Sequence, residues 1–185
     1  MWTIELRLRC ATNHWQNGSD GGLAARANYL AADRPDIQYS AKEICRWMQE
    51  PTELSVIALK RLARYLKGKP RLVFNYRWQQ ACAGDVFCDT DWAGCPRTRK
   101  STSGGCLMIG GHLIKSWSST QQSISLSSGE AEMVGVTKGA AAALGFRSLL
   151  ADLGLPWPVR IWTDSTASIG TVSYTHLTLP TTPYV

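Results

Sequence analysis

The spacing of apolar residues changes near Arg71, and this change constrains the possible fold more than any other feature of the sequence. Up to that point apolar residues recur at helical spacing, and Pro35, Pro51 and Gly68 interrupt the pattern. Beyond it, short β-favouring runs alternate with glycine and serine until a longer helical pattern begins. The sequence therefore predicts a helical segment followed by a segment that contains a β-sheet.

Three helices are predicted in the first segment. Residues 23–33 are rich in alanine and leucine, which favour helix. Pro35 suits the first turn of a second helix and Pro51 starts a third, which Gly68 and Pro70 end. The apolar stripes expected on the second and third helices comprise Ile37, Ser40, Ala41, Ile44, Cys45 and Met48, and then Leu54, Ile57, Ala58, Leu62, Tyr65 and Leu66.

The second segment predicts a meander of antiparallel strands. Its β-favouring runs are residues 71–76, 85–91, 103–111, 112–118 and 122–127. A long helix follows at about 128–153, with an apolar repeat that includes Met133, Val136, Ala140 and Leu144. A strand at 159–164 and a helix capped by Ser165 come next. Three antiparallel strands, a helix, a strand and a helix imply a mixed α/β sheet with helices packed on it.

Positive charge is concentrated in the first half of the chain. Residues 1–82 carry 13 basic and 7 acidic side chains, whereas residues 83–185 carry 7 of each, so the net charge of +6 arises before residue 83. This asymmetry favours a phosphate-rich partner. Lys60, Arg64 and Lys67 share a helical face that we expect to contact a duplex backbone, the alternative being a solvated face.

Composition excludes several classes of protein. No stretch approaches the roughly 18 apolar residues of a membrane span, so no membrane partner is expected. The N-terminus lacks the apolar centre of a signal peptide. The six cysteines form no CxxC pair, and no histidine lies at a zinc-ligand spacing from them. We therefore expect reduced thiols in an intracellular protein, in a cytoplasmic particle or the nucleus; disulfides or a zinc site are the alternatives.

Three acidic residues lie on three different predicted elements of the neutral half. Asp89 belongs to a strand, Glu132 to the first turns of the long helix, and Asp164 to the end of a later strand. They converge if the two strands are neighbours, and divalent cations would then stabilise the cluster because Mg²⁺ prefers oxygen ligands. Two such ions can clamp a scissile phosphate. Individually, each acid is also typical of a turn, a cap or a helix dipole partner, so spacing alone leaves both interpretations open.

The same half contains, in order, the blocks DTDWAGCPRTRKSTSGGC, SWSSTQQSISLSSGEAEM and IWTDSTASI. This set resembles the ribonuclease H domain of copia-type long-terminal-repeat retrotransposon polyproteins. The segment from Tyr29 to Lys69 resembles the part of the same polyproteins that follows the fingers and palm of the reverse transcriptase. The resemblance covers about residues 23–172 and is specific, because several distinct blocks occur in the family's order.

The resemblance implies a ribonuclease-H-like fold preceded by a helical connector. The implied parts are an unmatched leader (1–22), a helical reverse-transcriptase tail or connector (23–82), an incomplete ribonuclease H domain (83–172) and a non-native tail (173–185). The tail has no acid and no helical periodicity, whereas the family supplies a further strand, a helix and a fourth metal-site acid there. We therefore expect a C-terminally truncated sheet in a fragment of a larger polyprotein.

Carried over residue by residue, the catalytic, metal-binding acids of the family fall on Asp89, Glu132 and Asp164. They would hold two Mg²⁺ ions, or Mn²⁺, and the implied activity is hydrolysis of the RNA strand of RNA–DNA hybrids during reverse transcription. The implied partners are the hybrid and the remainder of the polyprotein with its reverse transcriptase. We expect Asp91 to support the turn that follows its strand. Glu130 lies roughly 200° from Glu132 around the helix, so we expect Glu130 to face solvent.

A basic, hydroxyl-rich tract follows the strand that carries Asp89, and it fits the same resemblance. Arg97, Arg99, Lys100 and Ser101 are expected to contact phosphates or 2′-hydroxyls without reading bases. A solvated loop is the alternative interpretation of this tract.

Two other functions remain compatible with the sequence. One is a catalytically inactive, nucleic-acid-binding fragment of a retrotransposon polyprotein. The other is an integrase or transposase core, against which the position of the second acid argues, because integrases place their corresponding glutamate on a later helix.

Overall fold

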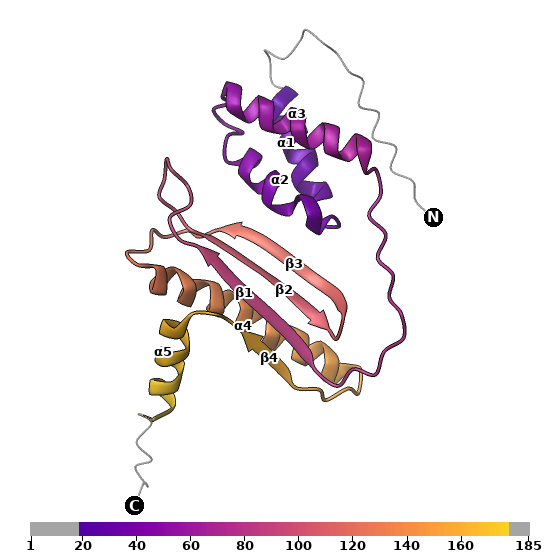
Figure 1. Ribbon diagram of the computed structural model, residues 1–185, viewed down its shortest axis with the longest axis vertical. Helices are drawn as coiled ribbons and strands as arrows, with labels where there is room; N and C mark the ends of the chain where they lie inside the picture. Colours follow the sequence, from indigo (N-terminus) through magenta and orange to yellow (C-terminus); the bar gives the residue numbers. More distant parts are fainter. Residues whose placement is uncertain (1–18, 178–185) are drawn as a thin grey trace, which may run out of the picture. The chain divides into compact units, whose positions relative to one another are not determined.

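The computed structural model of the protein describes residues 19–177, and in it the chain divides after Leu72 into two units with separate hydrophobic cores (Figure 1). The predicted leader up to residue 18 and the predicted tail from residue 178 lie outside the described residues. Within the described range, no helix combines the length and hydropathy needed to cross a bilayer. The five cysteines of that range form no disulfide.

The first unit is helical, as predicted. It consists of α1 (Ser19–Leu30), the short 3₁₀ helix η1 (Pro35–Ile37), α2 (Gln38–Cys45) and α3 (Glu53–Gly68). α1 begins at Ser19, ahead of the predicted start at residue 23. Its alanines pack against apolar side chains of the other helices, and the buried core comprises Ala24, Ala27, Ala31, Ile37, Ala41, Ile44, Leu59 and Leu62.

The apolar stripe predicted for α3 is partly wrong. Leu59 and Leu62 are buried together with Ser55, whereas Leu54 is 78% exposed and Ile57 is also exposed. The reason is that α3 has apolar residues on more than one face, so periodicity alone did not identify the side that meets α1 and α2. The cap at the start of α3 accounts for the buried serine, because the hydroxyl of Ser55 and that of Thr52 each accept a hydrogen bond from the other's backbone N–H.

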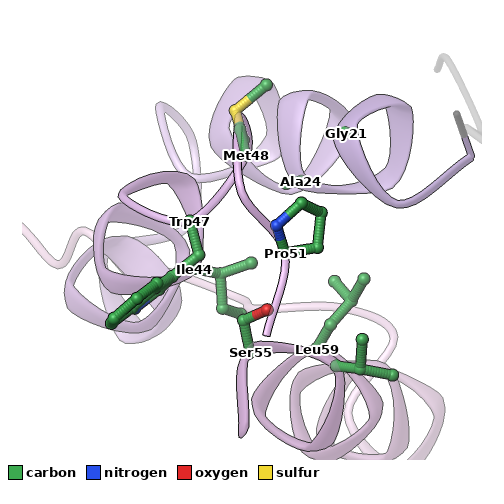
Figure 2. Close-up of a pocket in the computed structure, with 9 residues that line it drawn as sticks. Gly21, Ala24, Ile44, Trp47, Met48, Pro51, Ser55 and Leu59 are labelled. Carbon is green, nitrogen blue, oxygen red and sulfur yellow. The ribbon is translucent and has the colours of Figure 1, made fainter. Parts of the chain in front are cut away.

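A crevice lies between α1, the end of α2 and the start of α3, and Figure 2 shows the side chains that line it. Ala24, Ile44 and Leu59 make it largely apolar. Its volume of about 10 Å³ is room for no more than one water molecule. The Ser55 hydroxyl in its lining already donates to the Thr52 carbonyl at 2.7 Å. A crevice this small, lined mostly by apolar side chains, is a packing feature of the helical unit.

The second unit is an α/β structure built on a four-stranded mixed sheet. Its elements are β1 (Gly84–Asp91), β2 (Thr102–Ile109), β3 (His112–Thr120), α4 (Ser128–Asp152), β4 (Val159–Trp162) and α5 (Thr166–Leu177). The strand order is β3-β2-β1-β4, with β1 antiparallel to β2, β2 antiparallel to β3, and β4 parallel to β1. The predicted mixed sheet is therefore present, but the strand pattern differs from the predicted one at two places.

The run at residues 71–76 is not a strand. It belongs to a stretch without regular structure that side chains tether to the β2–β3 hairpin. The hydroxyl of Tyr76 donates to the Leu113 carbonyl at 2.8 Å, and the Gly111 N–H donates to the side chain of Gln79 at 3.0 Å. Side-chain bonds of this kind replace the backbone ladder that β-propensity suggested.

The run at residues 122–127 is a loop for a similar reason. The carbonyl of Ser125 accepts from the indole N–H of Trp92 at 3.1 Å, and the N–H of Leu126 donates to the Glu130 carboxylate at 2.7 Å. These backbone groups are thus bonded to side chains instead of to a neighbouring strand. The alternation is also inverted, because Ser125 is buried while Ile124 and Leu126 are exposed.

The last described helix extends further than predicted. α5 runs to Leu177, although the tail from residue 173 shows no helical periodicity. Its start agrees with the prediction, since the Ser165 hydroxyl accepts from the Ser168 N–H at 3.2 Å and so caps the helix.

Helix α4 lies along one face of the sheet (Figure 1), and very small residues make this contact. The buried line is Ala131, Gly135, Gly139 and Ala143, whereas Leu144 of the predicted apolar repeat is 54% exposed. A Cβ atom added at Gly135 would lie 2.3 Å from Oγ1 of Thr90, and one at Gly139 would lie 2.0 Å from Sγ of Cys88. Both glycines are therefore required for this close approach of α4 to β1.

Replacement of Gly139 by alanine should destabilise the sheet unit by about 1–3 kcal/mol, because the added methyl group overpacks the contact with Cys88. Gly145 lies in the same helix with nothing within 4 Å of an added Cβ, so Gly145→Ala should instead add up to about 1 kcal/mol through helix propensity. Urea unfolding of both variants measures the difference. Equal effects of the two substitutions would contradict the close-packing interpretation.

A candidate metal centre at the ends of β1 and β4

The parallel pairing of β1 and β4 brings two acidic residues to the same end of the sheet. Phe87 pairs with Trp162 in this register. Asp89 lies two residues beyond Phe87 on β1, and Asp164 lies two residues beyond Trp162 where the chain leaves β4. Because the two strands run in the same direction, the side chains that follow them meet at one edge.

Helix α4 supplies the third carboxylate. The helix runs antiparallel to β1, since Gly135 approaches Thr90 and Gly139, one turn later, approaches Cys88. Its first turns therefore lie at the end of β1 that carries Asp89, and Glu132 is in those turns. One carboxylate oxygen from each of Asp89, Glu132 and Asp164 lies within 4.8 Å of the others. Among the described residues, this is the one group of three acids so arranged.

The electrostatics of this acidic cluster (Asp89, Glu132 and Asp164) are unfavourable without a cation. Burial raises the pKa of Glu132, and the charges of Asp89 and Asp164 raise it further, while a backbone hydrogen bond from Thr90 opposes the shift. Oε2 of Glu132 is buried without a hydrogen-bond partner. An unpartnered buried oxygen beside two more carboxylates is suited to hard divalent cations such as Mg²⁺ or Mn²⁺, which take oxygen ligands.

The neighbouring acids Asp91 and Glu130 lie outside the acidic cluster. A Cβ atom added at Gly94 would lie 1.7 Å from Oδ2 of Asp91, so that carboxylate covers the turn after β1. Glu130 is exposed and accepts from the N–H of Leu126 at 2.7 Å. Its backbone N–H in turn donates to the Ser127 hydroxyl at 3.1 Å, which makes Glu130 part of the cap of α4.

The predicted nucleic-acid contacts after β1 are only partly accessible. Arg97 and Arg99 are exposed and Lys100 is half-buried in the turn between β1 and β2. Arg99 has a φ of 54°, in the left-handed region, and its N–H donates to the Cys95 carbonyl at 2.8 Å.

Ser101, the fourth predicted contact of this tract, does not present its side chain to solvent. Its side chain is 0% exposed, and its hydroxyl accepts from the Ala93 N–H at 3.0 Å. The Ser101 carbonyl accepts from the Gln121 N–H at 2.8 Å. This serine therefore closes the turn instead of facing a ligand.

The second predicted basic group lies on α3 in the helical unit. Lys60, Arg64 and Lys67 are all exposed on one face of that helix. Two acids of the same unit form ion pairs with other basic residues: Asp36 pairs with Arg34 at 2.8 Å, and Glu43 pairs with Arg46 at 3.0 Å.

Gly135 and Gly139 position the acidic cluster but are not among the site residues predicted from the sequence. The sequence feature that could have identified them is the repeat of small residues every four positions in α4, starting at Ala131. That repeat indicates a helix face that approaches another backbone closely.

Comparisons with known proteins relate the chain to transposon polyproteins. It is 37% identical over 131 residues to an uncharacterized mitochondrial protein of Arabidopsis thaliana, a match that covers 70% of this chain and 54% of that protein. It is 36% identical over 135 residues to the retrovirus-related Pol polyprotein from transposon RE1 of the same plant, covering 72% of this chain and 9% of the polyprotein. The corresponding polyprotein from transposon RE2 is 35% identical over 147 residues, covering 78% of this chain and 10% of the polyprotein.

The chain thus spans about half of the first relative and about a tenth of the two polyproteins. It is homologous to one part of retrovirus-related Pol polyproteins of transposons. No protein-family model matches the chain, and no solved structure does.

Glu132→Gln should raise the Tm of the metal-free protein at neutral pH, because it removes a charge from a crowded, partly buried position. The folded-state pKa lies above the ordinary value of 4.5, so the wild type loses stability as pH rises between these two values. The Tm difference between Glu132→Gln and the wild type should therefore be absent below pH 4.5 and grow as pH rises from 4.5 to the folded-state pKa of Glu132. Above that folded-state pKa the difference should stay constant. Thermal unfolding in EDTA over a pH series measures this.

Glu130→Gln is the matched control, since it removes the same formal charge two residues away in the same helix. It weakens the charge at the N-terminus of α4, so its Tm should be unchanged or lower. Equal gains for both variants would show that Glu132 is not in a repulsive cluster.

Proposed function

We propose that this protein is the ribonuclease H segment of a retrotransposon Pol polyprotein, which hydrolyses the RNA strand of RNA–DNA hybrids with Mg²⁺ or Mn²⁺ during reverse transcription. The observation that carries the proposal is the convergence of Asp89, Glu132 and Asp164 from β1, α4 and the end of β4. Homology to retrovirus-related Pol polyproteins supports it, because the sequence blocks that hold these acids resemble the ribonuclease H domain of such polyproteins. The mixed sheet ordered β3-β2-β1-β4 is compatible with a ribonuclease-H-like fold.

In this proposal the three acids of the cluster would hold two divalent ions. When bound, such ions offset charge on the scissile phosphate and lower the pKa of the attacking water. The chain's own residues bind and orient: the Thr90 N–H donates to Oδ1 of Asp89 at 2.8 Å and so fixes one carboxylate beside Glu132. The carboxylates act as ligands, so hydrolysis requires no covalent bond between enzyme and substrate.

The substrate would be held through its backbone, which suits an enzyme that recognises a hybrid by shape. Arg97, Arg99 and Lys100 follow the strand that carries Asp89 and are the proposed contacts in the sheet unit. Residues 83–172 are then the nuclease, and residues 23–82 are the connector, whose basic face on α3 contacts the duplex.

Cleavage of a labelled RNA–DNA hybrid in Mg²⁺ tests the reaction. Asp89→Asn should lower the rate at least about a hundredfold, because even residues that merely support metal ligands contribute 10–100-fold. Asp91→Asn makes the same charge change on the same strand, and it should retain cleavage because Asp91 covers the turn at Gly94. Cleavage that survives Asp89→Asn and Asp164→Asn would refute the assignment. Hybrid binding without cleavage by the wild type would favour an inactive nucleic-acid-binding segment.

Charge removal on α3 tests the proposed duplex contact. Replacement of Lys60, Arg64 and Lys67 by glutamine should weaken hybrid binding and reduce the slope of log affinity against log salt by about one for each lost phosphate contact. Binding titrations at several salt concentrations measure both effects.

A second triple variant of the same unit controls for the loss of three charges. It replaces Arg26, Lys42 and Arg46 by glutamine, and the last two of these form ion pairs with Glu43. This variant should keep most of the salt slope. Equal losses in the two triple variants would show that binding depends on net charge and not on the α3 face.

A further inference from the structure

One buried amide links the elements that carry the acidic cluster. Gln121 lies directly after β3 and is 5% exposed. Its Nε2 donates to the Ser103 hydroxyl at 2.9 Å and to the Ala131 carbonyl at 2.8 Å. Its Oε1 accepts from the Ser125 hydroxyl at 3.1 Å. The side chain thus bonds at once to β2, to the loop before α4 and to the first turns of α4.

The two groups that share Nε2 lie next to the candidate metal ligands. Ser103 pairs with Thr90 in the β1–β2 register, and Thr90 follows Asp89. Ala131 directly precedes Glu132. A single side-chain nitrogen therefore connects the sheet beside one acid to the backbone beside another.

A second hydrogen bond holds the same loop from the other side. The carbonyl of Ser125 accepts from the indole N–H of Trp92 at 3.1 Å, and Trp92 follows the last residue of β1. Ser125 is therefore bonded through its hydroxyl to Gln121 and through its carbonyl to the turn after the strand of Asp89. The loop before α4 is thus bonded to the turn after β1 and, through Gln121, to the first turns of α4. These two elements carry Asp89 and Glu132.

Apart from the backbone hydrogen bond from Thr90 to Glu132, the other contacts at the start of α4 act differently. The caps from Ser127 and Glu130 join the helix to its own preceding loop. The glycine contacts set how closely α4 approaches β1, but van der Waals contacts are not directional. The hydrogen bonds of Gln121 are directional, so they can fix the position of the first turns along the helix axis.

We propose that Gln121 is a positioning residue that holds Glu132 beside Asp89 and Asp164 in the metal-free protein, so that the divalent-cation site is assembled before an ion arrives. Its role toward the ion rests on the function proposed above, whereas its effect on the acidic cluster does not. Residues that orient metal ligands contribute substantially to metal affinity in proteins, and Gln121 would act in this way through the backbone next to Glu132.

A thermodynamic cycle without metal tests the positioning. Tm values are measured in EDTA for the full chain, for Glu132→Gln, for Gln121→Met, and for the double variant. Without its directional bonds the first turns of α4 can move Glu132 away from the other acids. The Tm gain from Glu132→Gln should then fall to less than half of its wild-type size in the Gln121→Met background.

Gln122→Met is the matched control, because this glutamine is adjacent in sequence and exposed. The gain from Glu132→Gln should be complete in that background. An equal gain in the Gln121→Met and wild-type backgrounds would overturn the proposal, since a merely structural role lowers Tm without changing the coupling. If Gln121→Met does not fold, Ser125→Ala replaces it; a smaller reduction of the gain is expected there, and no reduction overturns the proposal.

Mn²⁺ binding to the free protein provides a second measurement that does not depend on activity. Gln121→Met should weaken Mn²⁺ binding by about 10–100-fold, and Gln122→Met should leave it unchanged. Unchanged binding in both variants overturns the proposal. It is also overturned if Glu132→Gln has no effect on the wild type and no Mn²⁺ binds, because no cluster would then exist to be positioned.

The outcomes separate this proposal from the proposed function. Mn²⁺ binding that depends on Gln121, in a protein that does not cleave the hybrid, supports positioning and refutes the nuclease assignment. Hybrid cleavage whose Mg²⁺ dependence is the same in Gln121→Met and the wild type supports the nuclease and refutes positioning.

Discussion

Helix α4 can lie against β1 only because the residues between them are small, and this contact brings the start of the helix to the acidic edge of the sheet. With Gly135 against Thr90 and Gly139 against Cys88, the helix axis comes closer to the strand than larger side chains would allow. The start of α4 then lies at the end of β1, which brings Glu132 to Asp89. The parallel pairing of β4 adds Asp164 to the same edge.

The close approach also limits how much the sheet unit can gain from burial. Its buried apolar cluster is small, with Val86, Cys88, Leu107 and Ala143 at the centre and larger side chains such as Trp117 at its margin. The unit in addition carries the burial of Glu132 and its repulsion from Asp89 and Asp164, which together raise the pKa of that carboxyl. Buried hydrogen bonds such as those of Gln121 can hold a crowded site of this kind in place.

The two units divide the charge of the molecule between them. Residues 19–72 carry ten basic and six acidic side chains, and Arg34 and Arg46 are paired with acids inside the unit. The basic face of α3 contributes three of these ten basic side chains, Lys60, Arg64 and Lys67. The sheet unit combines three acids at one edge with a short basic turn, as expected if cations and a phosphate backbone meet there.

Local sequence determined much of this protein. Helical periodicity, proline and glycine located the helices, and the serine at 165 identified the cap of α5, because these signals act over a few residues. The acids at 89, 132 and 164 could be named as candidates from their blocks, and the structure places them together. Only the tertiary structure decided which face of α3 is buried, that residues 71–76 and 122–127 are not strands, and that Ser101 is inaccessible. Those outcomes depend on partners distant in sequence, such as Trp92 for Ser125, and local propensity carries no information about such partners.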